Sequence, residues 1–210
     1  MSDSLNFHSH DAKAAILTLN TTQYLGFQAA DSQLFTVGIH PWDTNGDQSA
    51  LLEDFSKCLR GNNIVAIGEI GVDPLRGDDI DLQYALMQHQ AKCAEEVGLP
   101  VVFHIVRRFD LLINLHKELN PKQAWAVHGF RGKPEVVRQL AERGIYMSLG
   151  SNFNSESAKA IPDHLLLVET DDRPLESIGE VVKAVAEARG CSIATIENIC
   201  SNNLKNFYRL

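Results

Sequence analysis

"IVAIGEIGVD" (64–73) and "PVVFHIV" (100–106) are apolar runs rich in β-branched residues, and they flank the helical pattern "DDIDLQYALMQHQAKCAEEVG" (78–98). The helical pattern places an apolar stripe on one face, with Asp78 or Asp79 as N-cap and Gly98 as the C-terminal stop. Two strands joined through a helix of this length predict a parallel pair with a crossover connection. This stretch therefore indicates an α/β fold.

The same alternation extends in both directions from that unit. A second helix is predicted over 133–144, where Pro134 stands at an early helical position and Gly144 follows the last turn. Six further runs read as strands: 5–10, 15–20, 34–41, 124–130, 146–150 and 165–171. Eight strands alternating with helices predict a TIM-like (βα)8 barrel. Only a few residues from Asp11 onward separate the first two strands, so the barrel is expected to be degenerate, with that helix missing.

Length and composition favour one globular domain over residues 1–210. Hydrophobic residues make up 44% and charged residues 22%, which is ordinary for a soluble globular protein. We find no apolar run long enough to span a membrane, and the N-terminus lacks the pattern of a signal peptide. A cytoplasmic location is expected, with no membrane and no obligate protein partner. The four cysteines are far apart, form no CxxC motif and are expected to be free thiols.

Histidines and carboxylates gather at the predicted strand ends. His8 and His10 lie two residues apart in "LNFHSH" (5–10), a spacing that sends two strand side chains to the same face. Four other strands end in His40, Glu69 with Asp73, His104 and His128, and the last strand ends in Asp171. In barrels the strand ends form one rim. A lone histidine there is more often an ordinary hydrogen-bonded group, but this whole set is costly to bury unless a metal binds it.

Six motifs resemble, in order and spacing, the TatD family of metal-dependent hydrolases (TatD-related DNases) in the amidohydrolase superfamily. They are "FHSH" (7–10), "VGIHP" (37–41), "IGEIGVD" (67–73), "VVFHIVR" (101–107), "VHGFRG" (127–132) and "LLLVETD" (165–171). The resemblance covers nearly the whole chain, from Asn6 to "NNLKNF" (202–207). It implies a TIM-like barrel with two divalent ions and, as in several members, DNase activity on single-stranded ends.

By this resemblance, His8, His10 and Asp171 are expected to bind one ion, and His104 and His128 the second. Glu69 is the expected bridging carboxylate, and His40 and Arg107 are expected substrate contacts. Gln83 and Gln90 match family positions without a clear role. The chain departs from the family at Asn6, where many members carry an acidic residue, and at Trp42, where members carry a histidine. These departures change the rim, and hence the choice of substrate, but remove no expected ligand.

The expected mechanism is hydrolysis by a metal-activated water, with Asp171 accepting a proton and the ions stabilising charge on the phosphoryl oxygens. The ions can be Mg²⁺, Mn²⁺ or Zn²⁺, since His and carboxylate ligands accept all three. No GxSxG, Walker A or GxGxxG motif supports acyl transfer or a nucleotide cofactor. By the resemblance, the residues expected to carry catalysis are Asp171, Glu69 and His40.

A net charge of −8 argues against a processive enzyme on long duplexes, because non-specific nucleic-acid affinity comes mostly from basic surface. A short single strand or another phosphodiester remains possible through loop cations, which are Arg76, Arg107, Arg108, Arg131, Lys133 and Arg173. Trp42 and Phe130 are candidates for stacking on bases, and Phe130 is equally a candidate for packing in the core. Two alternatives stay open. One is hydrolysis of another ester or amide, such as a lactone or aminoacylated RNA, and the other is a non-catalytic metal-binding barrel.

Overall fold

The computed structural model describes residues 5–28, 33–61 and 63–210. By contacts between Cα atoms, the chain forms two compact units. The first unit contains residues up to 17 and residues 124–210, and the second contains residues 18–123. None of the helices in the described ranges has the length and apolar character needed to cross a membrane.

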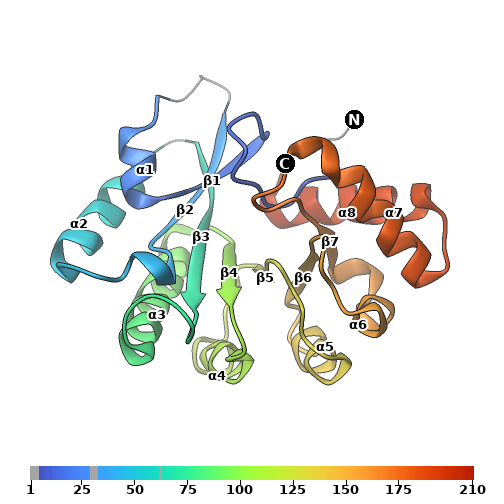
Figure 1. Ribbon diagram of the computed structural model, residues 1–210. Helices are drawn as coiled ribbons and strands as arrows, with labels where there is room; N and C mark the ends of the chain where they lie inside the picture. Colours follow the sequence, from blue (N-terminus) through green and yellow to red (C-terminus); the bar gives the residue numbers. More distant parts are fainter. Residues whose placement is uncertain (1–4, 29–32, 62) are drawn as a thin grey trace. The chain divides into compact units, whose positions relative to one another are not determined.

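The second unit alternates strands and helices in chain order, as Figure 1 shows in blue to green. β2, β3 and β4 pair in parallel in that order, which confirms the prediction from residues 64–106. The elements are β1 (Ile16–Asn20, where the chain enters this unit), α1 (Thr21–Gly26), β2 (Leu34–Gly38), η1 (Pro41–Asp43), α2 (Gln48–Cys58), β3 (Ile64–Val72), α3 (Ile80–Val97), β4 (Val101–Ile105) and α4 (Phe109–Leu119).

α3 begins and ends where its capping residues predict. Asp79 is the N-cap and its side chain accepts a hydrogen bond from the backbone N–H of Asp81. Gly98 follows the last turn with φ +75°, a left-handed conformation that costs glycine nothing. Two glutamines on the buried face of this helix, Gln83 and Gln90, point polar groups toward the loops after β2 and β3.

The first unit repeats the pattern with shorter strands. β5 pairs in parallel with β6, and β6 with β7, while α8 packs against β7 and α7. Pro134 opens α5 as predicted, and Gly144 follows that helix with φ +67°. The elements are β5 (Trp125–Val127), α5 (Pro134–Ala141), β6 (Tyr146–Leu149), α6 (Ser155–Ala160), η2 (Asp163–Leu165), β7 (Leu166–Val168), η3 (Leu175–Ser177), α7 (Ile178–Arg189) and α8 (Ile193–Tyr208).

The predicted first strand, residues 5–10, is a bridged extended segment instead of a strand. It makes two isolated parallel bridges, Asn6 with Val168 and Ser9 with Asp171. Asp171 has φ +56°, outside the extended region, so the backbone beyond β7 cannot continue a regular ladder. The expected eight strands are thus corrected to seven strands in the described residues plus this segment. Residues 11–15 contain no helix, as predicted.

The C-terminal helix holds the segment that carries His8. The Tyr208 hydroxyl donates a 2.9 Å hydrogen bond to the backbone oxygen of Phe7, and the two rings stack with centroids 5.4 Å apart. Phe207 contacts the same phenylalanine edge-on. Burial raises the pKa of Tyr208 well above its ordinary value, so the hydroxyl keeps its proton at neutral pH.

Tyr208→Phe is expected to lower the free energy of unfolding by about 1–2 kcal/mol, because the buried Phe7 carbonyl loses its donor. Urea denaturation of both proteins measures the loss. Tyr146→Phe is the matched control, since Tyr146 also contacts Phe207 but is only half-buried. An equal loss in the two variants would contradict a specific role for the Tyr208 hydroxyl.

The cysteines are free, as expected. Burial raises the pKa of Cys58 to about 11 and that of Cys200 to about 12, so both stay protonated thiols at neutral pH. Cys191 lies between α7 and α8, outside both helices.

Candidate active site

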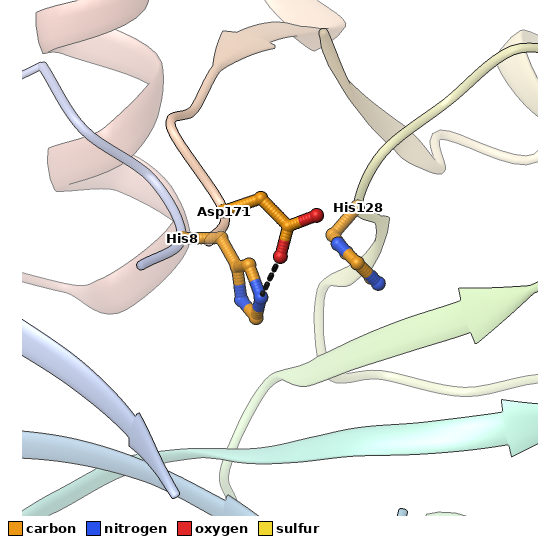
Figure 2. A group of neighbouring side chains, drawn as sticks. All are labelled: His8, His128 and Asp171. Carbon is orange, nitrogen blue, oxygen red and sulfur yellow. Dashed lines mark ion pairs between the residues drawn. The ribbon is translucent and has the colours of Figure 1, made fainter. Parts of the chain in front are cut away.

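Three side chains of the first unit converge where β5 and β7 end. Figure 2 shows His8 from the bridged segment, His128 from just after β5 and Asp171 from just after β7. Nε2 of His8 lies 3.7 Å from Oδ1 of Asp171, and the rings of His8 and His128 have centroids 4.4 Å apart. One ligand atom from each residue lies within 4.8 Å of the others. His8 and His128 are buried, so their imidazole nitrogens, which could bind a metal ion, are held in place.

His10 approaches the same carboxylate from the exposed side. Its Nε2 lies 3.7 Å from Oδ1 of Asp171, and its ring stands edge-on to that of His8, with centroids 5.1 Å apart. Asp172 joins His10 and Asp171 as a second possible donor group. The predicted meeting of His8, His10 and Asp171 is therefore present, although residues 5–10 form no strand.

Glu169 is a functional candidate that the sequence reasoning missed. It is fully buried, and its Oε1 accepts a 2.6 Å hydrogen bond from the backbone N–H of Gly129 and lies 3.4 Å from Nδ1 of His128. A carboxylate on one ring nitrogen orients the other nitrogen toward a metal. An acidic residue directly after the buried run Leu166–Val168 is itself a signal, because a buried carboxylate needs partners.

In the second unit, Glu69 lies between two histidines. Its Oε1 is 3.4 Å from Nδ1 of His104 and 3.9 Å from Nε2 of His40, and the carboxylate is buried. The rings of His40 and His104 have centroids 4.7 Å apart. Donor atoms of these three residues lie within 4.8 Å of one another. Glu69 lies within β3 and His104 within β4, so they do not follow the strand ends as the sequence predicts, but the predicted side chains still come together in this unit.

The proton on His40 can be placed from its backbone contact. His40 is the N-cap of η1, and its Nδ1 accepts a 3.1 Å hydrogen bond from the backbone N–H of Trp42. A neutral imidazole that accepts at Nδ1 carries its proton on Nε2. His40 is therefore suited to donate a hydrogen bond from Nε2, which a metal ligand at that nitrogen cannot do.

Gln83 and Gln90 have structural roles in this unit. Oε1 of Gln90 accepts a 2.7 Å hydrogen bond from the backbone N–H of Ile39, the residue before His40. Oε1 of Gln83 accepts a 2.7 Å hydrogen bond from the backbone N–H of Asp73, and its Nε2 donates to the carbonyl of Arg76 at 2.8 Å. Both glutamines are buried on α3, so they hold the loops after β2 and β3 in place.

The arginines of the loops differ in exposure and in whether a carboxylate already pairs with them. Arg107 is exposed, three residues after His104, and has φ +62°. Arg108 forms two hydrogen bonds with Asp110, and this contact lowers the pKa of that carboxyl group.

The two aromatic residues considered for stacking differ in exposure, because Phe130 is only 1% exposed whereas Trp42 is 40% exposed. Of the two roles left open for Phe130, its burial supports packing.

A cleft of about 160 Å³ opens beside Asp171 in the first unit. It contains basic, polar and acidic side chains, which include Arg131, Arg173, Ser151, Asn152, Glu169 and Asp171. Arg173 forms an ion pair with Glu180 at 2.7 Å, so part of its charge is balanced. Oε2 of Glu169 has no hydrogen-bond partner among the described residues, which leaves a buried acceptor beside the cleft. Such a cleft suits a small anionic group held next to a cation.

Comparison with known proteins adds a family and a fold. The family model described as TatD related DNase matches residues 10–209. The uncharacterised metal-dependent hydrolase YjjV of Escherichia coli K12 is 32% identical over 152 residues, which are 66% of this chain and 58% of the relative. The 3'-5' ssDNA/RNA exonuclease TatD of Escherichia fergusonii is 26% identical over 199 residues, which are 82% of this chain and 76% of the relative.

The crystal structure of YjjV, a TatD homologue, superimposes with a TM-score of 0.85 at 21% identity and covers 100% of both chains. This likeness confirms the α/β, TIM-like fold that the sequence predicts. The first curated relatives are longer than the region they share with this chain, since the match spans 58% of their length.

Proposed function

Because this chain belongs to the TatD-related DNase family, we propose that it is a metal-dependent phosphodiesterase that releases nucleotides from the ends of single-stranded DNA. The observation that carries the proposal is the convergence of His8, His128 and Asp171 beside a cleft that contains arginines. The family model spans residues of both units, which supports one hydrolase domain over residues 1–210.

The donors of the first unit fit a divalent cation. Two buried imidazoles and a carboxylate are ligands that Mn²⁺ and Zn²⁺ accept, and Mg²⁺ binds through the carboxylate. His8, His10 and Asp171 would hold the ion, as the sequence resemblance implies, and the contact between Glu169 and His128 supports His128 as a metal ligand. When bound there, a divalent cation would act as a Lewis acid and lower the pKa of bound water from about 15.7 towards 7.

Asp171 would accept the proton of the attacking water in this unit. Its carboxylate faces His8 and His10 and also borders the cleft, so one oxygen can remain a ligand while the other accepts a proton from water. Its backbone has φ +56°, outside the extended region that β7 adopts. Asp171 is therefore the proposed general base.

The second unit would hold a second divalent cation through Glu69 and His104, which lie 3.4 Å apart. His40 would donate from Nε2 to a phosphoryl oxygen, since its Nδ1 already accepts from Trp42. The exposed guanidinium of Arg107 would contact the substrate phosphate. The roles of Glu69 as a bridging carboxylate and of His128 and His104 as ligands of one ion stay predictions.

The net charge of the chain and the names of its relatives support a single-stranded nucleic acid as the substrate. A relative named as an exonuclease on single-stranded DNA and RNA supports a single-stranded end. The net charge of −8 leaves little basic surface for a long duplex. Arg131 and Arg173 border the cleft beside Asp171 and would contact a phosphate there.

The test is release of nucleotides from end-labelled single-stranded DNA with added Mg²⁺, Mn²⁺ or Zn²⁺. We expect release that requires one of these ions and stops when a chelator is added, because the histidine and carboxylate groups then lose their cation. An equal amount of the same sequence as duplex is the control and should be degraded more slowly. Failure of all three ions to support release would contradict the proposal.

A further inference from the structure

Trp42 is held on the surface of the second unit next to the histidines of the candidate site. It is 40% exposed, yet its indole Nε1 donates a 2.7 Å hydrogen bond to Oδ2 of Asp73, which is buried. Its ring meets His40 and His104 edge-on, with centroid distances of 4.8 and 5.5 Å. These contacts fix the orientation of a large aromatic ring that the core does not enclose.

Arg76 lies over the ring of Trp42, with its guanidinium carbon 4.4 Å from the ring centroid. This is the distance of a cation–π contact. The loop that carries Arg76 is held by Gln83, whose Nε2 donates to the carbonyl oxygens of Arg76 and Asp78 at 2.8 Å each. The ring and the cation are therefore already arranged before any ligand binds. We refer to Trp42 and Arg76 together as the Trp42–Arg76 platform.

We propose that the Trp42–Arg76 platform binds a nucleobase of the single-stranded substrate by stacking. Bases stack on aromatic rings and on guanidinium planes, and every base has such a face, so the site would accept all four. Arg76 adds a positive charge that favours the adjacent phosphate in a chain of net charge −8. The inference rests on the proposed function, because it names the part of that substrate that this surface recognises.

The position of Trp42 favours a base over other occupants. The indole adjoins His40, whose Nε2 proton is proposed to contact a phosphoryl oxygen, so a base on the ring would belong to a nucleotide whose phosphate lies near the histidines. Phe130, the other aromatic residue considered for stacking, is buried and cannot take this role. By the sequence resemblance, Trp42 stands where many family members carry a histidine.

The test measures binding without cleavage, in buffer that contains a chelator. Two ligands are compared: a short oligothymidylate and an abasic oligomer with the same number of phosphates. The chain has two tryptophans, and Trp125 is only 2% exposed, so quenching of fluorescence by the oligomer reports on Trp42. We expect the wild type to bind the oligothymidylate about 5- to 100-fold more tightly than the abasic oligomer.

Fluorescence anisotropy of end-labelled oligomers gives the same comparison for variants that lack the reporter. Trp42→Ala should bind both oligomers alike, whereas Trp42→Phe should keep most of the preference because an aromatic ring remains. Phe27→Ala is the matched control, since it removes a 37% exposed aromatic residue of the same unit and should keep the full preference.

The proposal is overturned if the wild type shows no preference for bases, or if Trp42→Ala keeps it. Metal-dependent nucleotide release is measured separately on the same preparations. A preference that depends on Trp42 without any release would support the platform and contradict the phosphodiesterase activity. Release of nucleotides without a preference for bases would support the phosphodiesterase activity and contradict the platform.

Discussion

Asp171→Asn is expected to lower the metal-dependent release of nucleotides by about 10²–10⁴-fold, the usual contribution of a positioned general base. Asparagine has nearly the same shape, but its amide accepts no proton from water and is a weaker metal ligand. Asn also tolerates the left-handed backbone at this position, where φ is +56°, so the fold should persist. Initial rates on end-labelled single-stranded DNA at saturating metal measure the loss.

Glu176→Gln is the matched control for Asp171→Asn. Glu176 is an exposed carboxylate that also follows β7, and it belongs to none of the metal-binding groups found in the described residues. The control variant should keep the wild-type rate. A rate in Asp171→Asn that matches this control would remove Asp171 from the mechanism and leave its contacts with His8 and His10 as structural only.

Glu69→Gln is expected to lower activity by more than the roughly 10–100-fold lost when an outer partner of a metal ligand is removed. Glu69 is the carboxylate that lies within 4 Å of both His40 and His104, so the variant loses the anionic donor of the second unit. The amide keeps the volume of the buried carboxylate and removes a charge from a buried position. Stability without metal should therefore be unchanged or higher, as is common when a functional charge is removed.

Thermal unfolding with and without Mn²⁺ separates these two effects. The wild type should gain stability with metal, by about 2.7 kcal/mol at a hundredfold excess over its dissociation constant. Glu69→Gln should gain less stability with metal than the wild type. Glu96→Gln is the control, because Glu96 is exposed on α3, and it should gain as much stability as the wild type. A full gain in Glu69→Gln would show that Glu69 does not bind the ion.

The alternation of strands and helices could be predicted because it depends on neighbours in the chain. Asp79 caps α3 by accepting a hydrogen bond from the N–H of Asp81. Gly98 ends α3 because glycine readily adopts the left-handed backbone conformation found there. The order of the strands is also set locally, so the sequence could place His40, His128 and Asp171 shortly after strands. His8 meets Asp171 as expected, although residues 5–10 form no strand.

The missed residue and the missed role depend on contacts between distant parts of the chain. Glu169, which the sequence reasoning did not select, is defined by its contact with Gly129, forty residues earlier. Gln90 was selected without a role, and its bonds to Ile39 define that role. A carboxylate or an amide has the same local pattern whether it caps a helix or holds a loop from across the core. Only the fold identifies its partner.

The sequence by itself determined the α/β class, the caps of α3 and the positions of His40, His128 and Asp171 shortly after strands, because each follows from local spacing. The tertiary structure alone decided that residues 5–10 make two bridges and no strand, that Phe130 is buried, and that Trp42 is exposed beneath Arg76. Burial and pairing are set by which surfaces the whole chain brings together, and this information is absent from any short window of sequence.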